Sequence, residues 1–294
     1  MTHTILWEIA LELPHSKYIE IFEAAFERLS VATATFQIET TPKWRFTVYI
    51  PDEVTKAALE KKLQSIESHA GVSLPVKTIR TITERDWVAE YQKGMRPIKV
   101  GSYYISGSHV SDPTPLGCVS VKIDAGLAFG TGGHETTRSC LEAMEEICGE
   151  RPPVNALDLG TGSGILAIAL AKRHKVLVFA GDQDHVAIRV ARENAVVNGV
   201  GKYIKFFKSD GFQNPELRRN APFELIIANI FSKPLIGLAE DIANATGTNG
   251  KVVLSGILTP QVEAVTDTFR DRGLVLIKKI IKADWETVVL ERVT

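Results

Sequence analysis

Cysteine is scarce in this sequence, and the few cysteines present are not spaced for a disulfide framework or a zinc site. Among 294 residues there are only Cys118, Cys140 and Cys148, an odd number, and no two of them form a C-x-x-C pair. We therefore expect small, buried, reduced thiols. No metal site is predicted.

Long apolar runs and an excess of one charge are also missing. The longest apolar runs, such as the one at residues 224–228, fall far short of the roughly 20 residues that span a bilayer. The N-terminal residues do not have the pattern of a signal peptide, so we expect a cytoplasmic protein with no membrane contact. Lys and Arg total 34 against 35 Asp and Glu. This balance argues against direct nucleic-acid binding, although it is compatible with a local basic patch.

Residues 1–82 have the pattern of a small α+β domain. Apolar side chains alternate over residues 5–13, which is typical of a half-buried strand, and then recur at helical spacing from Tyr18 to Leu29. Strand patterns follow at 31–40, 44–50 and 76–82, with a second helix predicted to open at Pro51 and Asp52. This order predicts the ferredoxin-like plan. Because these residues contain no catalytic constellation, we interpret the domain as a binding or positioning module.

Residues 83–95 are expected to form a linker helix, and residues 96–294 a second domain. After a β-rich stretch at 98–123 and a helix at 134–148, strands and helices alternate, which predicts a doubly wound, Rossmann-like α/β sheet. Strands are expected at 154–158, 176–180, 203–207, 225–229 and 252–256, and helices at 165–173, 186–198, 234–245 and 260–270. Two closing β segments, 274–281 and 287–293, suggest an antiparallel end to the sheet.

A glycine-rich turn joins the first strand and helix of this alternation. Residues 158–166 read DLGTGSGIL, so glycines fall at 160, 162 and 164. Glycine lets the backbone approach a ligand closely, and the helix N-terminus that follows attracts an anion, either a pyrophosphate or the carboxylate of S-adenosylmethionine. A dinucleotide fingerprint has its glycines at G-x-G-x-x-G. The spacing here, after an acidic residue, is instead the form found in class I methyltransferases. We expect Gly160 and Gly162 to contact the cofactor.

Acidic residues follow the next two strands. Asp182 comes at the end of one strand, where a carboxylate can accept hydrogen bonds from both hydroxyls of a ribose. Asp184 is better suited to cap the following helix. Asp210 follows the third strand and could contact the adenine amino group, but a plain turn residue is almost as good an interpretation.

Two further segments carry polar groups towards the expected site. Asn229 ends a buried strand, where its side chain could accept hydrogen bonds from an incoming amine or simply terminate the strand. Residues 126–137 form a glycine-rich loop that enters a helix and could cover a cofactor as a lid. His134 lies in this loop. A capping or hydrogen-bonding histidine is the more frequent outcome there than a general base.

Taken together, these motifs resemble the ribosomal protein L11 methyltransferase family. Residues 126–137 resemble its signature loop, residues 87–101 its linker and entry strand, and Asn229-Ile230 followed by Pro234-Leu235 its substrate-side motif. The resemblance covers nearly the whole chain, most firmly residues 84–260. It implies that the N-terminal domain recognises the substrate. Two residues depart from the family's usual pattern: Gly133 stands where threonine is common, and Phe231 where leucine is common.

The resemblance also implies an activity. The chain would methylate lysine ε-amines and the terminal α-amine of ribosomal protein L11, with S-adenosyl-L-methionine as cofactor. Matched residue by residue, it implies cofactor contacts at Thr137, Gly160, Asp182 and Asn229. Because a sulfonium methyl group is already activated, we assign Asn229 an orienting role and require no dedicated base.

Three alternatives remain at this level. A nicotinamide-dependent oxidoreductase is disfavoured by the glycine spacing. A methyltransferase acting on another protein, on RNA or on a small molecule has the same cofactor motifs. A binding module that retains the fold without turnover would also have them.

Overall fold

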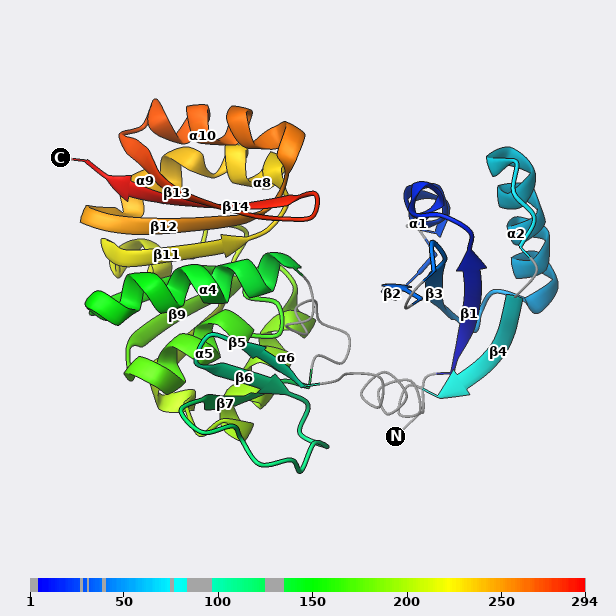
Figure 1. Ribbon diagram of the computed structural model, residues 1–294, viewed down its shortest axis with the longest axis horizontal. Helices are drawn as coiled ribbons and strands as arrows, with labels where there is room; N and C mark the ends of the chain where they lie inside the picture. The colour runs from blue at the N-terminus through cyan, green and yellow to red at the C-terminus, as the bar shows by residue number, and fades with distance from the viewer. Residues whose placement is uncertain are drawn as a thin grey trace. The chain divides into compact units, whose positions relative to one another are not determined.

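The computed structural model describes residues 5–26, 29–30, 32–38, 41–74, 77–83, 97–124 and 135–293. The chain divides into two compact units, residues 1–91 and 92–294 (Figure 1). Residues 84–95 of the expected linker helix lie outside the described residues.

The first unit has the predicted ferredoxin-like order. Its four strands form one antiparallel sheet in the order β2-β3-β1-β4. Alternate residues of β1, Ile9, Leu11 and Leu13, are buried against apolar residues of the helices such as Phe22. The elements are β1 (Ile5–Leu13), η1 (Ser16–Tyr18), α1 (Ile19–Phe26), β2 (Ala32–Gln37), β3 (Trp44–Pro51), α2 (Lys56–Ala70) and β4 (Lys77–Thr83).

Helix α2 begins later than the sequence predicted. Pro51 is the last residue of β3, and the helix starts at Lys56. Thr55 caps it by accepting a hydrogen bond from the backbone N–H of Ala58 at 3.3 Å. The predicted opening at Pro51 and Asp52 was therefore wrong, because a threonine nearer the periodic apolar residues supplies the cap.

The second unit is built on a seven-stranded sheet in the order β10-β9-β8-β11-β12-β14-β13. The first five strands in this order, β10, β9, β8, β11 and β12, pair in parallel with their neighbours. Strand β14 pairs antiparallel with β12 and β13, as predicted for the closing segments. The strands are β8 (Asn155–Leu159), β9 (Leu177–Asp182), β10 (Ile204–Lys208), β11 (Phe223–Asn229), β12 (Thr246–Leu258), β13 (Leu274–Lys282) and β14 (Trp285–Arg292).

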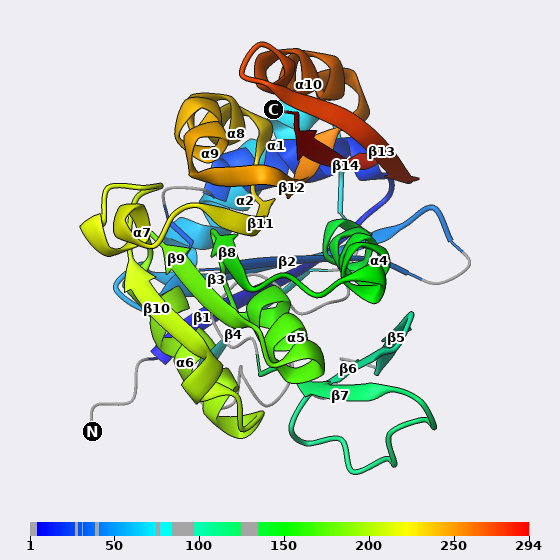
Figure 2. The same cartoon turned by 90° about the vertical axis from the view of Figure 1, so that its left-hand side faces the viewer.

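Helices cover both faces of this sheet. Figure 2 shows α4, α5 and α6 on one face and α8, α9 and α10 on the other. Strand β11 is correspondingly buried on both sides: Leu225 and Ile227 belong to one core cluster, and Ile226 and Ala228 to the other. The helices are α4 (Glu135–Glu150), α5 (Ile165–His174), α6 (His185–Val197), α7 (Pro215–Arg219), α8 (Ser232–Gly237), α9 (Ala239–Ala245) and α10 (Val262–Arg270), with short 3-10 turns at η2 (Gly201–Tyr203) and η3 (Thr259–Gln261).

Some details differ from the sequence prediction. The helix expected at 234–245 is two helices, α8 and α9, which meet at Leu238 because its backbone leaves the helical region after Gly237. Helix α7 was not predicted, although Asn214 and Pro215 are a cap and a first-turn proline. The β-rich stretch forms a separate sheet of β5 (Ile98–Val100), β6 (Tyr103–Ser106) and β7 (Val119–Lys122).

Two expectations about the whole chain can also be compared with the structure. All three cysteines are free, with Cys140 and Cys148 buried and Cys118 partly exposed. Among the described residues, no helix is both long and apolar enough to cross a bilayer.

Candidate functional site

The candidate site lies at the edge of the seven-stranded sheet where the parallel strands end. Strands β8, β9, β10 and β11 are neighbours and run in the same direction, so their carboxyl ends meet at one edge. Open α/β sheets bind ligands at this edge. Most of the residues predicted from sequence stand at or just beyond these strand ends, while Thr137 lies in the first turn of α4.

The glycine-rich turn after β8 requires its glycines. Gly160, Gly162 and Gly164 have φ angles of 74°, 54° and 83°, which side chains rarely allow. A Cβ on Gly160 would lie 2.4 Å from Cγ2 of Ile230, and one on Gly164 would lie 3.0 Å from Cβ of Ala191. Glycine is therefore needed here both for the turn and for close packing.

The side chain of Asp158 stabilises this turn through hydrogen bonds. Its carboxylate accepts hydrogen bonds from the Thr161 hydroxyl at 2.7 Å and from the backbone N–H of Ala167 at 3.1 Å. The side chain is fully buried, and burial raises the pKa of the carboxyl from 3.8 to about 6 against the lowering effect of these hydrogen bonds. The sequence predicted an acidic residue before the glycines but no role for it. Its place in the motif was the signal.

This buried carboxyl predicts a pH dependence of stability. Because its folded pKa lies above its unfolded one, its stabilising contribution is fully present below about pH 4 and is lost as the pH rises through about 6. As the pH rises through that window, the free energy of unfolding of the neutral variant Asp158→Asn should therefore rise relative to that of the parent protein, by up to about 3 kcal/mol. Urea unfolding of both proteins at several pH values measures the difference. A difference independent of pH would contradict the prediction, and the exposed Asp184→Asn is the control.

Asp182 is joined to the glycine turn by its side chain. One carboxylate oxygen accepts the backbone N–H of Gly162 at 2.9 Å, and the other accepts the N–H of Asp184, also at 2.9 Å. The next aspartate caps α6 as predicted, since Asp184 accepts the N–H of Val186 at 2.8 Å. The structure therefore brings Gly160, Gly162 and Asp182 together and fixes the carboxylate with both oxygens held by backbone donors.

Thr137 and Asn229 also come together, although they are far apart in sequence. The Asn229 side-chain nitrogen donates to the Thr137 hydroxyl at 3.4 Å. Thr137 is buried in the first turn of α4, and Asn229 is half-buried at the end of β11. Residues 126–134 of the expected lid loop, including His134, lie outside the described residues.

A buried polar group that sequence analysis missed lies beside this pair. Ser255 is the register partner of Asn229 on β12, and its hydroxyl is 2.6 Å from that of Thr287. The same Ser255 hydroxyl donates to the carbonyl of Thr136 at 3.4 Å. These contacts tie the start of α4 to the sheet. A serine and a threonine inside apolar strand patterns were the available signal.

Within the described part of the chain, Asp210 makes its hydrogen bonds to Gln213 and not to the other predicted site residues. It is exposed, and its carboxylate accepts a hydrogen bond from the Gln213 side chain at 3.2 Å. The neighbouring Ser209 is the buried residue, with its hydroxyl 2.7 Å from the Gly211 carbonyl. The adenine contact of Asp210 stays a prediction. The hydrogen bond with Gln213 fits the alternative interpretation of Asp210 as a turn residue.

Comparison with known proteins gives one consistent result. The sequence model of the family described as ribosomal protein L11 methyltransferase (PrmA) matches residues 12–293. The ribosomal protein L11 methyltransferase of Brucella suis is 37% identical over 272 residues, covering 92% of this chain and 93% of the relative. That of Rhizobium meliloti is 36% identical, covering 99% and 100%.

The chain belongs to the ribosomal protein L11 methyltransferase family. A solved structure of the ribosomal protein L11 methylase from Lactobacillus delbrueckii subsp. bulgaricus is also similar, with a TM-score of 0.62 and 26% identity. It covers 68% of this chain and 100% of that one. The family resemblance stated from the motifs is confirmed, and so is the fold class.

As a member of the L11 methyltransferase family, the chain has one departure in the described part of the site. Phe231 follows Asn229 and Ile230 directly and is 73% exposed at the start of α8. Its exposed ring adds apolar surface beside the carboxyl end of β11. The other departure, Gly133, lies outside the described residues.

Proposed function

We propose that this chain transfers methyl groups from S-adenosyl-L-methionine to lysine ε-amino groups and the N-terminal α-amino group of ribosomal protein L11. The family match over residues 12–293 supports the reaction and the acceptor. The observation that carries the cofactor assignment is the hydrogen bond from the Gly162 backbone to the Asp182 carboxylate, which couples the glycine turn to the predicted ribose ligand. We assign the enzyme to the cytoplasm, where ribosomal proteins are synthesised.

The residues at the strand ends fit S-adenosylmethionine. The turn at Gly160 and Gly162 has no side chains that would hold a ligand away, and α5 begins beyond it at Gly164, which has no side chain to cap the helix. In the first turn of α5, the buried Asp158 carboxylate accepts the N–H of Ala167. Such a helix start suits the cofactor's carboxylate. Asp182 would accept the ribose hydroxyls, because each of its oxygens keeps acceptor capacity beyond its one backbone hydrogen bond. The bound cofactor would supply a methyl group on a positive sulfonium.

Asn229 would orient the acceptor amine. Its side-chain nitrogen is directed to Thr137, so the amide oxygen is the group left to accept an N–H from the amine. A lysine must lose a proton before it attacks, which costs about 4.6 kcal/mol at pH 7 for an unperturbed side chain. A nearby positive charge and desolvation lower that pKa, and water can take the proton. We therefore assign no side chain of this protein as a base.

The N-terminal unit would select the acceptor. It is a compact α+β unit of its own, and its sequence has no recognisable catalytic constellation. Residues 98–293 of the second unit contain the sheet edge with all the predicted cofactor contacts. We propose the division as residues 1–82 for recognition, 83–95 for the connection and 96–294 for methyl transfer.

Mass spectrometry of methylated acceptors tests this proposal. Purified full-length chain, S-adenosylmethionine and recombinant L11 should give L11 heavier by multiples of one methyl group, with fragments modified at lysines and at the N-terminal amine. The chain without residues 1–82 should still bind the cofactor but leave L11 unmodified. If L11 stays unmodified while ribosomal RNA or another protein is methylated, the proposed acceptor is wrong and the methyltransferase activity still holds.

A further inference from the structure

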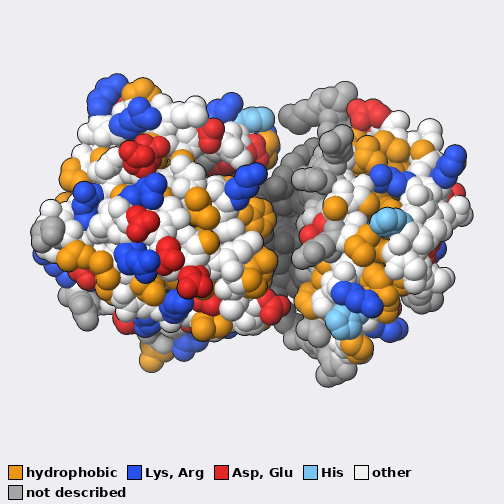
Figure 3. Space-filling view, turned by 90° about the horizontal axis from the view of Figure 1, so that it is seen from above, with side chains coloured by type: hydrophobic (Ala, Val, Ile, Leu, Met, Phe, Trp, Pro, Cys, Tyr) orange, Lys and Arg blue, Asp and Glu red, His pale blue; other side chains and the backbone are white. Residues whose placement is uncertain are grey.

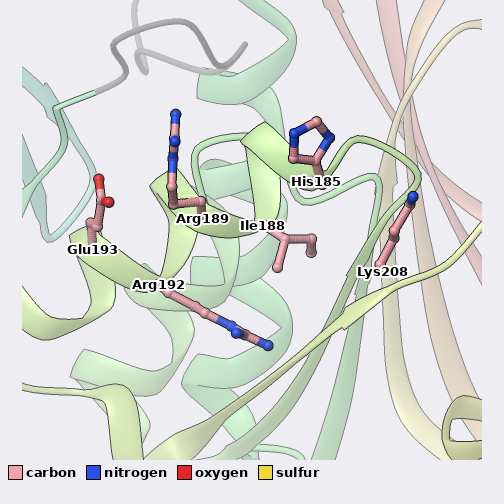
Figure 4. Close-up of a pocket in the computed structure, with 6 residues that line it drawn as sticks. All are labelled: His185, Ile188, Arg189, Arg192, Glu193 and Lys208. Atoms are coloured by element: carbon pink, nitrogen blue, oxygen red, sulfur yellow. The ribbon is translucent and has the colours of Figure 1, made fainter. Parts of the chain in front are cut away.

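A basic pocket lies on the outer side of α6, at the edge of the seven-stranded sheet. Its volume is about 390 Å³. Lys208 comes from the end of the edge strand β10, and the other lining residues come from α6 (Figure 4). The basic pocket is lined by His185, Ile188, Arg189, Arg192, Glu193 and Lys208.

The charges lining the basic pocket are unbalanced. Arg189, Arg192 and Lys208 are cationic at neutral pH, and Glu193 is the one carboxylate of the lining. His185 would add a further positive charge when protonated, although the capping carboxylate of Asp184 lies 3.7 Å from it. The chain is nearly neutral overall, so this local excess of positive charge is not a consequence of composition.

Some basic residues elsewhere in this unit are paired with carboxylates. Among the described residues, carboxylate partners lie within 4 Å of Arg151, Arg173, Arg219, Arg270, Lys278, Lys279 and Lys282. Within the same described ranges, no ion pair involves Arg189, Arg192 or Lys208. On the face of the larger unit shown in Figure 3, blue and red side chains are interspersed. In the basic pocket, three cations and one carboxylate share the lining, and none of the three cations forms an ion pair within the described residues.

Parts of the pocket are fixed before any ligand arrives. Arg192 donates from one guanidinium nitrogen to the backbone carbonyl of Phe206 at 3.1 Å, which anchors its side chain against β10. Ile188 is 6% exposed and packs into the protein, so it gives the pocket a firm apolar wall. Lys208 is the register partner of Asp182, so the pocket adjoins the strand end that carries the predicted ribose ligand.

We propose that the basic pocket binds phosphate groups, carried either by an RNA chain or by a small phosphate ester. Guanidinium and ammonium groups are the usual partners of phosphate oxygens, and Arg189 and Lys208 are both exposed and unpaired in the described structure. The volume exceeds that of one phosphate group, and the apolar wall can pack against an attached sugar. Guanidinium groups also bind carboxylates, so competition by an acidic peptide is part of the test.

Fluorescence anisotropy with a labelled single-stranded RNA of about ten nucleotides tests the proposal on the full chain. We expect the double variant Arg189→Gln/Lys208→Gln to bind about 10-fold more weakly at low salt. Its plot of log affinity against log salt should be shallower by about 1.4, because two phosphate contacts are lost at about 0.7 each. Lys202→Gln, which removes an exposed charge outside the pocket, is the matched control and should change affinity less than about 2-fold.

Competition distinguishes the sources. Displacement of the RNA by millimolar ribose 5-phosphate, with the same sensitivity to the double variant, would assign the pocket to small phosphate esters. Displacement by longer RNA alone would assign it to RNA. Equal affinities of the parent protein, the double variant and Lys202→Gln would overturn the proposal, as would equally strong competition by polyglutamate. Methylation of RNA-free L11 should be unchanged in the double variant. Because this assay does not depend on RNA binding, a failure of the proposed methyltransferase function can be told apart from a failure of the pocket proposal.

Discussion

Replacement of Asp182 by alanine is expected to weaken binding of S-adenosylmethionine by about 100-fold or more. The carboxylate is held by the Gly162 and Asp184 backbone N–H groups, so its position is set before the cofactor binds. Two hydrogen bonds from ribose hydroxyls to a charged group contribute about 1.5 kcal/mol each at the low end of their range, which together correspond to a factor of more than 100. Isothermal titration calorimetry of the variant and the parent protein measures this difference.

Asp184→Ala is the matched control for that experiment. Asp184 has the same charge and lies two residues away, but its carboxylate is engaged in capping α6 through Val186. Its loss should cost about 1 kcal/mol of stability and leave cofactor affinity within about 3-fold. Unchanged affinity in Asp182→Ala, or an equal loss in both variants, would show that Asp182 is not the ribose ligand. The cofactor affinity of Asp182→Asn should lie between those of Asp182→Ala and Asp184→Ala, because asparagine keeps the shape of the side chain and loses its charge.

The order of elements could be predicted because both domains have regular apolar patterns. Strand β11 is an example: residues 223–229 are apolar except at Glu224 and Asn229, and both faces of the strand are buried. Boundaries were less predictable where short polar signals compete. At α2 the Pro51-Asp52 pair looked like a helix start, yet Thr55 supplies the cap four residues later. Local caps are decided by one hydrogen bond, which an apolar period does not reveal.

The site was predictable to the extent that it follows from strand ends. Gly160, Gly162 and Asp182 could be expected to lie together because neighbouring parallel strands bring their carboxyl ends to one edge, and in the structure the Gly162 backbone N–H donates to the Asp182 carboxylate. The Ser255–Thr287 contact could not be predicted, because it depends on the antiparallel pairing of β12 with β14. The basic pocket was missed because it too depends on tertiary packing. Its charges come from α6 and β10, and only the packing of the helix on the edge strand brings them together.

Gly160→Ala is expected to damage both folding and methyl transfer. The new methyl group would meet Cγ2 of Ile230 at 2.4 Å, in a backbone with φ of 74° that alanine disfavours. The overpacking and the backbone strain together should cost about 2–4 kcal/mol of stability. Ile230 follows Asn229 directly, so relief of the clash would move the residue proposed to orient the amine. A displacement of about 1 Å there should lower kcat/KM by about 100-fold.

A matched glycine and a compensating change separate these causes. Gly199 has nearly the same φ, 67°, with no atom within 4 Å of its ideal Cβ, so Gly199→Ala should cost only the backbone strain of about 1 kcal/mol and leave activity unchanged. Ile230→Ala removes the clashing methyl group. In the Gly160→Ala background it should therefore restore stability beyond what the two single variants predict by addition, measured by urea unfolding. If Gly160→Ala behaves like Gly199→Ala, or if Ile230→Ala adds its own cost without compensation, contact between the glycine turn and the end of β11 does not position Asn229.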